Sequence, residues 1–203
     1  MFYSGSAQAK PGHGAKECLA PGDSSKNYPD LRKRPNWRKS LSAMHHEPGQ
    51  PALRVTWPKD LDPLGRERQY ATKEHAYHAA KFLGRDEKVA RQFEADSGSV
   101  IAVDPFRAKS YGGKKGTVKD KETKLVLLQR PKHVTMNPKF VTEKDQWLVT
   151  VDMAKFTQWP EARAVLLGTG NAELTHWTRG KPQVVETGLM QVRDALRVSQ
   201  PDG

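Results

Sequence analysis

Four side chains that can carry charge or exchange protons recur at helical spacing within residues 72–83. Glu74, Tyr77, His78 and Lys81 occupy positions i, i+3, i+4 and i+7, which places them on one face of a helix. The same spacing also occurs in ordinary surface ion pairs, and a Glu in a first helical turn complements the helix dipole. Spacing alone therefore leaves a chemical role and a surface role both open. The order Glu-His-x-x-His differs from the His-Glu-x-x-His of zinc sites, so no metal site is predicted.

Local signals predict the helix that carries these four side chains. Thr72 is a good cap for the first turn, and Gly84 supplies a stop after Leu83. The remaining face is apolar and predicts packing against a core. It consists of Ala76, Ala79, Ala80 and Leu83.

Further elements follow from the same reasoning. A strand is expected at residues 53–57, and the charged stretch from Pro58 to Gln69 is expected to be a connection. Residues 126–128 suit either a strand or a buried helix. Helices are expected at residues 87–95, 105–111, 142–157, 160–167 and 187–198, with a frayed tail after about residue 199.

Composition narrows the class of protein. The 203 residues suit one domain, 1–203, and no apolar run is long enough to span a membrane. A single cysteine, Cys18, excludes an internal disulfide and fits a reducing compartment. No secretory signal is visible, so an intracellular location, cytoplasmic or nuclear, is expected. The net charge of +11 favours a polyanionic partner, although Lys-rich surfaces also serve solubility.

Three segments contain basic residues together with glycines or a tryptophan, and each could bind part of a phosphate-containing ligand. A Gly-rich loop at residues 10–17 suits either a phosphate or an ordinary surface turn. Trp37 lies among basic residues, which fits a stacked base as well as an anchor to the core. Gly112 and the following lysines suit a phosphate or a plain helix end with a solvated basic loop.

Motifs distributed over nearly the whole chain resemble the NADAR family, also called YbiA-like. The central one is Thr-x-Glu-His-Ala-Tyr-x-Ala-Ala-Lys-Phe-Leu at residues 72–83. The others, in the family's order, are Phe2-Tyr3-Ser4, Trp37-Arg38-Lys39-Ser40-Leu41-Ser42, Ala108-Lys109-x-x-Gly112, Trp147 with Met153 and Lys155-Phe156, the segment Leu166–Leu174, and Gly188-Leu189-Met190-x-Val192-Arg193.

The resemblance implies an α+β fold, mainly helical with a few short strands, and an N-glycosidase activity. Some relatives resemble enzymes that remove ADP-ribose from guanine bases in nucleic acid, and others process riboflavin-pathway intermediates. Cleavage of a ribose–nitrogen bond builds positive charge on the sugar and needs a carboxylate beside it, for which Glu74 is the candidate. His78 and Lys81 are candidates for support or proton donation. No cofactor is implied, and the expected partner is ADP-ribosylated nucleic acid.

An ADP-ribose ligand would also need cations, amides and stacking surfaces. The candidates are Gly14, Lys16, Trp37, Arg38, Ser42, His75, Lys109, Gly112, Lys115, Trp147, His176 and Arg179.

Two departures from the family pattern bear on the substrate. Ala43-Met44 follows Leu41-Ser42 where the family has Asn-Phe, and the interval from His176 to Pro182 is short. His176 also occupies the place of a Glu. The short basic segment is consistent with a larger, nucleic-acid-linked substrate. The alternatives are an N-glycosidase acting on a small ribosylated metabolite and a binding module without catalysis.

Overall fold

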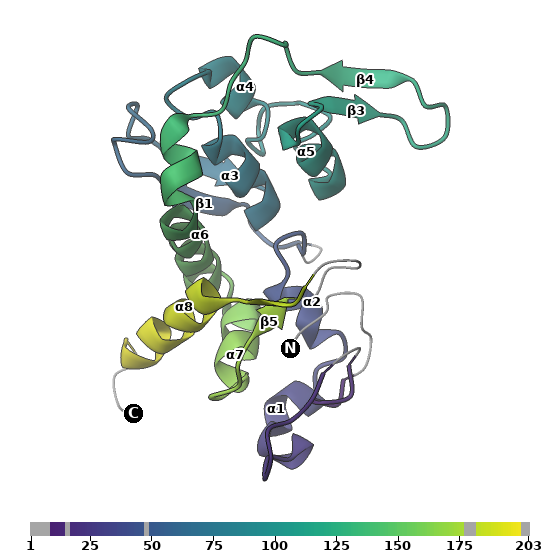
Figure 1. The fold of residues 1–203 in the computed structure, drawn as a ribbon, viewed down its shortest axis with the longest axis vertical. Helices are drawn as coiled ribbons and strands as arrows, with labels where there is room; N and C mark the ends of the chain where they lie inside the picture. The colour runs from purple at the N-terminus through teal and green to yellow at the C-terminus, as the bar shows by residue number, and fades with distance from the viewer. Residues whose placement is uncertain (1–8, 15–16, 47–48, 177–181, 200–203) are drawn as a thin grey trace. The chain divides into compact units, whose positions relative to one another are not determined.

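The computed structural model describes residues 9–14, 17–46, 49–176 and 182–199 (Figure 1). The chain divides into two compact units. The first unit consists of Met1–His45 and Lys155–Gly203, and the second unit consists of His46–Ala154. Among the described residues, helices alternate with three short antiparallel two-stranded sheets, so the predicted α+β class is confirmed. The prediction of one domain stays a prediction.

The second unit contains the predicted helical motif. Its elements are β1 (Leu53–Thr56), β2 (Glu67–Tyr70), α3 (Lys73–Ala80), α4 (Glu87–Arg91), α5 (Pro105–Gly112), β3 (Thr117–Lys119), β4 (Val126–Gln129) and α6 (Pro138–Gln158) as far as Ala154. The first unit contains the end of α6 and the remaining elements. These are η1 (Ser25–Asn27), α1 (Pro29–Arg32), α2 (Trp37–Leu41), α7 (Pro160–Gly168), β5 (Thr175–His176), β6 (Val184–Val185) and α8 (Thr187–Val198).

Helix α3 forms as its sequence predicts. The Thr72 hydroxyl accepts a hydrogen bond from the amide of His75, which satisfies an exposed first-turn donor. Turns follow Ala80 as far as Arg85, and within them Gly84 has a φ of +65°, the left-handed conformation that favours glycine. The predicted packing face is fully buried, since Ala76, Ala79, Ala80 and Leu83 are each at most 1% exposed. Burial of that face therefore fixes which side of α3 the polar stripe occupies.

Three local expectations differ from the structure. The stretch from Pro58 to Gln69 ends in β2, which pairs with β1 in the register Leu53↔Tyr70 and Val55↔Arg68. The helix expected at residues 87–95 is shorter, because α4 ends at Arg91. Helix α6 begins at Pro138 rather than at Thr142, because the Asn137 side chain accepts from the Lys139 amide at 3.0 Å and caps the earlier turn.

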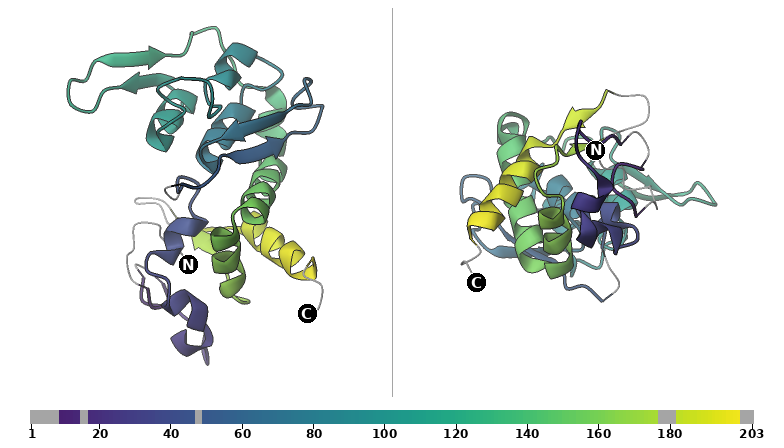
Figure 2. Two further views of the ribbon diagram at one scale, coloured as in Figure 1. Left: turned by 180° about the vertical axis from the view of Figure 1, so that it is seen from behind. Right: turned by 90° about the horizontal axis from the view of Figure 1, so that it is seen from below.

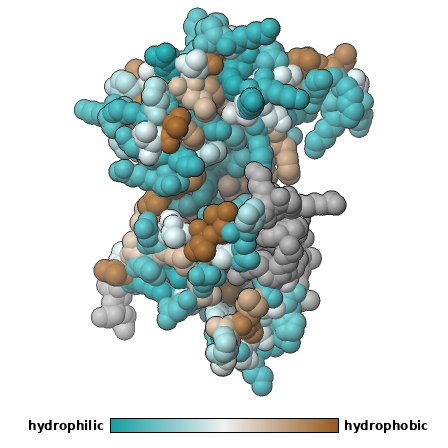
Figure 3. Space-filling model, in the orientation of Figure 1, coloured by the Kyte–Doolittle hydropathy of each residue, from teal (hydrophilic) through white to brown (hydrophobic). Residues whose placement is uncertain are grey.

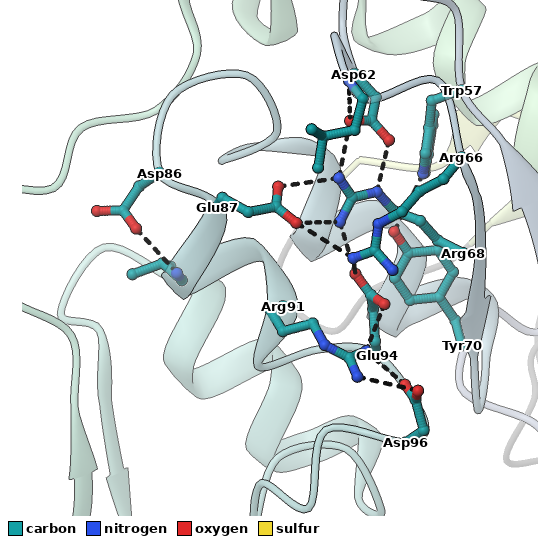
Figure 4. A network of polar contacts seen from close by, with 12 residues as sticks. Trp57, Asp62, Arg66, Arg68, Tyr70, Asp86, Glu87, Arg91, Glu94 and Asp96 are labelled. Carbon is teal, nitrogen blue, oxygen red and sulfur yellow. Dashed lines mark hydrogen bonds and ion pairs between the residues drawn. The ribbon is translucent and has the colours of Figure 1, made fainter.

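An ion-pair network explains the unexpected strand β2 (Figure 4). Arg68 is buried, and its guanidinium donates to Asp62 at 2.6 and 2.8 Å and to Glu94 at 2.6 Å. Glu87 at the start of α4 also accepts from Arg68, at 2.8 and 2.9 Å. A buried charge is tolerated only when it is paired and hydrogen-bonded. The network thus ties β2 to α4 with a residue that hydropathy assigns to the surface.

The first unit is organised around its buried tryptophans and helix α8. Trp159 and Phe156 are buried, and the predicted apolar stripe of α8 is confirmed, since Leu189, Val192 and Leu196 are each at most 4% exposed. Helices α7 and α8 pack against each other, as Figure 2 shows from two further sides. Within the described ranges, no helix is long and apolar enough to cross a membrane.

Candidate active site

The polar stripe on α3 is a connected chain of hydrogen bonds. Nε2 of His78 lies 3.1 Å from Oε1 of Glu74, and Nδ1 of His78 lies 2.9 Å from Nζ of Lys81. Nζ of Lys81 also donates to the carbonyl of Gly112 at 3.1 Å, which links α3 to the end of α5. The Tyr77 ring lies 4.8 Å from the same ammonium nitrogen. The predicted common face is therefore confirmed, and its four side chains form one cluster.

The neighbours of the imidazole assign its proton. An ammonium group has hydrogens to donate but cannot accept, so Nδ1 of His78 accepts from Lys81. Nε2 then carries the hydrogen of the neutral ring and donates it to the Glu74 carboxylate. The chain of hydrogen bonds therefore runs from Lys81 through His78 to Glu74. Each donor faces an acceptor, and the negative charge lies at the Glu74 end.

The cluster is buried, which excludes the ordinary exposed ion pair. The side chains of Glu74 and His78 are 13% and 5% exposed. Burial acts to raise the pKa of Glu74, but the hydrogen bond from His78 and the charges of Lys109 and Lys81 bring it below its ordinary value. Glu74 is thus an ionised carboxylate with limited access to solvent. A carboxylate of this kind can act as a nucleophile, as a base or as the partner of a developing cation.

The pKa values of the two basic residues beside Glu74, His78 and Lys81, are both lowered. Burial lowers the pKa of His78 below its ordinary value, and the charge of Lys81 adds to this effect, while the hydrogen bond to Glu74 opposes it. Burial also lowers the pKa of Lys81 to about 8, against the attraction of Glu74. At neutral pH His78 is therefore neutral and Lys81 is charged, as the hydrogen-bond directions require.

Packing holds His78 in place. Its ring stacks on Phe93 with centroids 6.2 Å apart and meets the Tyr77 ring edge-on at 5.2 Å. Gly112 covers another side, because a Cβ atom there would come within 2.2 Å of Nδ1 of His78. Helix α5 can approach α3 this closely only without a side chain at residue 112. Gly112 therefore belongs to the cluster through its lack of a side chain and through its carbonyl.

The other predicted residues of the second unit have different surroundings. Lys109 is exposed on α5, and its charge acts on Glu74. His75 is fully buried, with Nδ1 2.8 Å from the Thr72 hydroxyl and Nε2 2.8 Å from the carbonyl of Ile101. Trp147 is 2% exposed and packs on Phe140. Lys115 is exposed. Lys109 and Gly112 thus join the cluster around Glu74, whereas His75 and Trp147 are core residues.

In the first unit, the Gly-rich loop already binds a carboxylate. The amides of Gly12 and Gly14 both donate to Oε2 of Glu17 at 3.0 Å. Arg38 is fully buried and forms an ion pair with the same carboxylate. The Gly14 amide and the Arg38 guanidinium, both candidates for binding ADP-ribose, therefore bind Glu17 in this structure.

Trp37 contributes both to the core and to a cavity of about 710 Å³ within the first unit. Its Nε1 donates to the carbonyl of Ala9 at 3.0 Å. Asp23, Tyr28 and Asn171 line the same cavity, and among the described residues no Lys or Arg does. The described lining, which also includes Glu17 and Glu173, therefore lacks the cations that a phosphate would need.

The remaining predicted residues of the first unit lie apart from this cavity lining. The Ser42 carbonyl accepts from Nζ of Lys155 at 2.8 Å, and His176 is exposed, 3.4 Å from the Glu186 carboxylate. Lys16, Arg179 and the motif Phe2-Tyr3-Ser4 lie outside the described residues.

Sequence reasoning missed an ion pair one residue before Glu74. Nζ of Lys73 donates to Oδ2 of Asp152 at 2.6 Å, and within the described part of the chain Oδ1 of Asp152 is buried without a hydrogen-bond partner. The two residues are 79 positions apart in the sequence, so no local pattern signals the contact. Phe93, which packs on His78, lies two residues after the end of α4, within the stretch 87–95 that was expected to be helical. No group of three or more His, Cys, Asp or Glu in the described ranges is arranged to hold a metal ion.

The comparisons with known proteins concern the fold. No protein-family model matches the sequence, and no curated protein matches it significantly. The structure is similar to the NMR structure of the Escherichia coli protein YbiA, with a TM-score of 0.52 and 20% identity. The match covers 81% of this chain and 83% of the YbiA chain. This chain therefore has a YbiA-like α+β fold.

Proposed function

We propose that this chain is an N-glycosidase that removes ADP-ribose from guanine bases in nucleic acid. The observation that carries the proposal is the buried, ionised Glu74, held by the neutral His78 and the charged Lys81. The YbiA-like fold and the motif resemblance support the same reaction class. The fold likeness alone does not identify a substrate, so the site must carry the argument.

The reaction exchanges a carbon–nitrogen bond for a carbon–oxygen bond. As the bond between the ribose carbon and the guanine nitrogen breaks, its electron pair stays on the nitrogen and positive charge develops on the sugar. Glu74 stabilises that cation, either as a charge or as a transient nucleophile, and water supplies the oxygen of the free ADP-ribose. The guanine nitrogen gains a proton. Oε1 of Glu74 is occupied by His78, and Oε2 has no hydrogen-bond partner among the described residues, so Oε2 is the atom offered to the substrate.

His78 and Lys81 act as positioning residues in this scheme. Both direct their hydrogens along the chain toward Glu74 and the Gly112 carbonyl, so they hold the carboxylate ionised and correctly oriented. The desolvated surroundings strengthen these interactions relative to water. The proton that the leaving base needs enters from another donor or from the attacking water.

Glu74→Gln tests the proposal directly. The substrate is an oligonucleotide with ADP-ribose on a guanine, and the measurement is release of free ADP-ribose together with recovery of the unmodified oligonucleotide. The wild type is expected to release ADP-ribose, and Glu74→Gln is expected to lose turnover while keeping affinity for the substrate. Glu67→Gln is the matched control, since Glu67 is an exposed carboxylate of the same unit.

Three outcomes would contradict the proposal. If wild type and Glu74→Gln release ADP-ribose equally, Glu74 is not in the chemistry. If wild type releases none from the oligonucleotide but hydrolyses small ribosylated metabolites, the substrate class is wrong. Substrate binding without any turnover would instead indicate a binding module.

A further inference from the structure

One segment of the second unit carries most of the excess positive charge of the chain. Residues 105–132 contain nine Lys or Arg against two Asp or Glu, a surplus of seven where the whole chain has +11. The segment consists of α5, the β3–β4 hairpin and the residues that follow it. The hairpin itself, residues 117–129, contains three Lys against Asp120 and Glu122, and the other six Lys or Arg flank it in the sequence. We call residues 117–129 the basic hairpin.

The basic hairpin is exposed, and its tip is ordered by its own contacts. Lys119, Lys121 and Lys124 are all exposed. The Asp120 carboxylate accepts from the amides of Glu122 and Thr123 at 3.0 and 2.8 Å, so one of the two acidic residues serves the turn. The Asp120 amide donates to the Leu125 carbonyl at 2.9 Å and closes the loop. The exposed lysines therefore lie on or beside a defined turn, where Nζ of Lys124 donates to the carbonyl of Lys121.

The base of the hairpin is attached to the candidate active site through α5. Val118 is 1% exposed, and β3 packs on α5, which in turn packs on α3. Arg130 donates to the carbonyls of Tyr111 and Gly113 at the end of α5. Figure 1 shows the hairpin extending beyond α5. A ligand bound along the hairpin would thus lead toward the helix that supplies Lys109 and Gly112.

The hairpin mixes cations and apolar side chains on one face. Lys119 pairs with Val126 across the two strands, so both side chains lie on the same face. Leu125 and Val126 are 67% and 56% exposed. Figure 3 shows a mainly hydrophilic surface here with brown side chains at its outer edge. A lipid surface would favour a separate, continuous apolar face. Interleaved cations and apolar groups suit phosphates with bases or sugars between them.

The backbone conformation of Lys124 also supports a functional surface. It has a φ of +60°, a conformation that Gly and Asn adopt at much lower energy than Lys. Unfavourable backbone conformations concentrate at functional sites. A two-stranded ribbon also has the width that the major groove of B-DNA admits.

From these observations we infer that the basic hairpin is the surface on which the phosphate backbone of nucleic acid binds. The inference rests on the proposed function and deepens it, since it assigns the polymeric part of the substrate to a named element. The lysines hold the strand, and α5 leads from it to Glu74. Glycosidic cleavage needs the base out of the stack, so the hairpin would bind a single strand or the flanks of an exposed base.

The test removes three charges in two different places. The hairpin variant is Lys119→Gln with Lys121→Gln and Lys124→Gln. The control variant is Lys59→Gln with Lys88→Gln and Lys144→Gln, three exposed lysines of the same unit. Affinity for an unmodified oligonucleotide is measured against salt concentration for both variants and the wild type. Urea unfolding verifies that both variants are folded.

The hairpin variant is expected to lose affinity by about tenfold or more and to reduce the slope of log affinity against log salt by about 2. The control variant is expected to remain within about twofold of wild type. The hairpin variant should also hydrolyse ADP-ribosylated guanosine at the wild-type rate, while its kcat/KM on the modified oligonucleotide falls. Equal losses in the two variants would overturn the inference, because the charge would then act without a defined surface.

Binding and turnover separate this inference from the proposed function. If wild type shows no hydrolysis but the hairpin lysines still determine oligonucleotide affinity, the proposed reaction is wrong, whereas the proposed binding surface is supported. If hydrolysis of the modified oligonucleotide depends on Glu74 but not on the hairpin lysines, the proposed reaction is supported, whereas the proposed binding surface is wrong. Hairpin-dependent binding to vesicles containing phosphatidylserine, with no oligonucleotide binding, would also overturn the inference.

Discussion

Gly112 lies so close to His78 that a Cβ atom at residue 112 would be 2.2 Å from Nδ1 and 2.4 Å from Cγ of the imidazole. The ring cannot give way easily, since Phe93 and Tyr77 pack against it. The last residue of α5, Gly112, and the His78 ring on α3 are therefore in close contact that leaves no room for a side chain. The relationship makes the geometry around Glu74 sensitive to a single methyl group.

Gly112→Ala is expected to lower kcat by about two orders of magnitude, because a displacement of about 1 Å in a catalytic arrangement has an effect of that size. The measurement is kcat for ADP-ribose release, with a urea unfolding curve to quantify stability. Gly113→Ala is the control, since the nearest atoms to a Cβ there are backbone atoms of Lys109 and Ser110, at 3.0 Å and beyond, and not the ring of His78. Similar rates for the two variants would show that the position of His78 is unimportant.

The lowered pKa of Lys81 predicts that activity falls at alkaline pH. Burial lowers its pKa to about 8, so the ammonium is present at neutral pH and is lost as the pH rises through about 8. Without it, Nδ1 of His78 loses its charged donor, and Glu74 loses a nearby positive charge. We expect kcat/KM to fall above pH 8, and Lys81→Met to be slow and to lack this limb. Lys88→Met should keep the wild-type profile, and an unchanged limb in Lys81→Met would assign it to another group.

His75 predicts acid sensitivity of the fold. Burial lowers its pKa from 6.5 to about 4, so below pH 6.5 the unfolded chain binds a proton that the folded chain does not. Stability is therefore complete above pH 6.5 and declines as the pH falls toward 4, by about 3 kcal/mol in total. His78 shifts in the same direction and adds to the effect. Urea unfolding at pH 7 and 4.5 should show a smaller difference for His75→Gln than for wild type.

The Arg68 network predicts unequal effects of two neighbouring arginines. Arg68→Met removes the arginine partner of the buried Asp62 carboxylate and one of the three arginine partners of Glu94, and it is expected to cost about 3–5 kcal/mol. The side chain of Arg66 is 42% exposed, so Arg66→Met is expected to cost about 1 kcal/mol or less. Free energies of unfolding in urea provide the comparison. Equal losses would mean that the network contributes mainly through surface charge.

Much of α3 could be predicted because the determining signals are local. Thr72 caps it, Gly84 follows its last turns, and a period of 3.6 residues sorts its apolar face from its polar stripe. Helices α7 and α8 were predicted nearly to their ends for the same reason, since Pro160 and the α8 stripe are signals within the segment. Local capping also explains the error at α6, where Asn137 offers a cap five residues before Thr142.

The sequence by itself determined which side chains share the face of α3, because covalent spacing and helical period settle that order. Only the tertiary structure decided that this face is buried, that Gly112 presses on His78, and that Lys81 has a pKa near 8. It also decided that Arg68 is a core residue and that Glu17 occupies the glycine-rich loop. These outcomes depend on burial and on partners distant in the chain, and desolvation and charge pairing act through space rather than along the sequence.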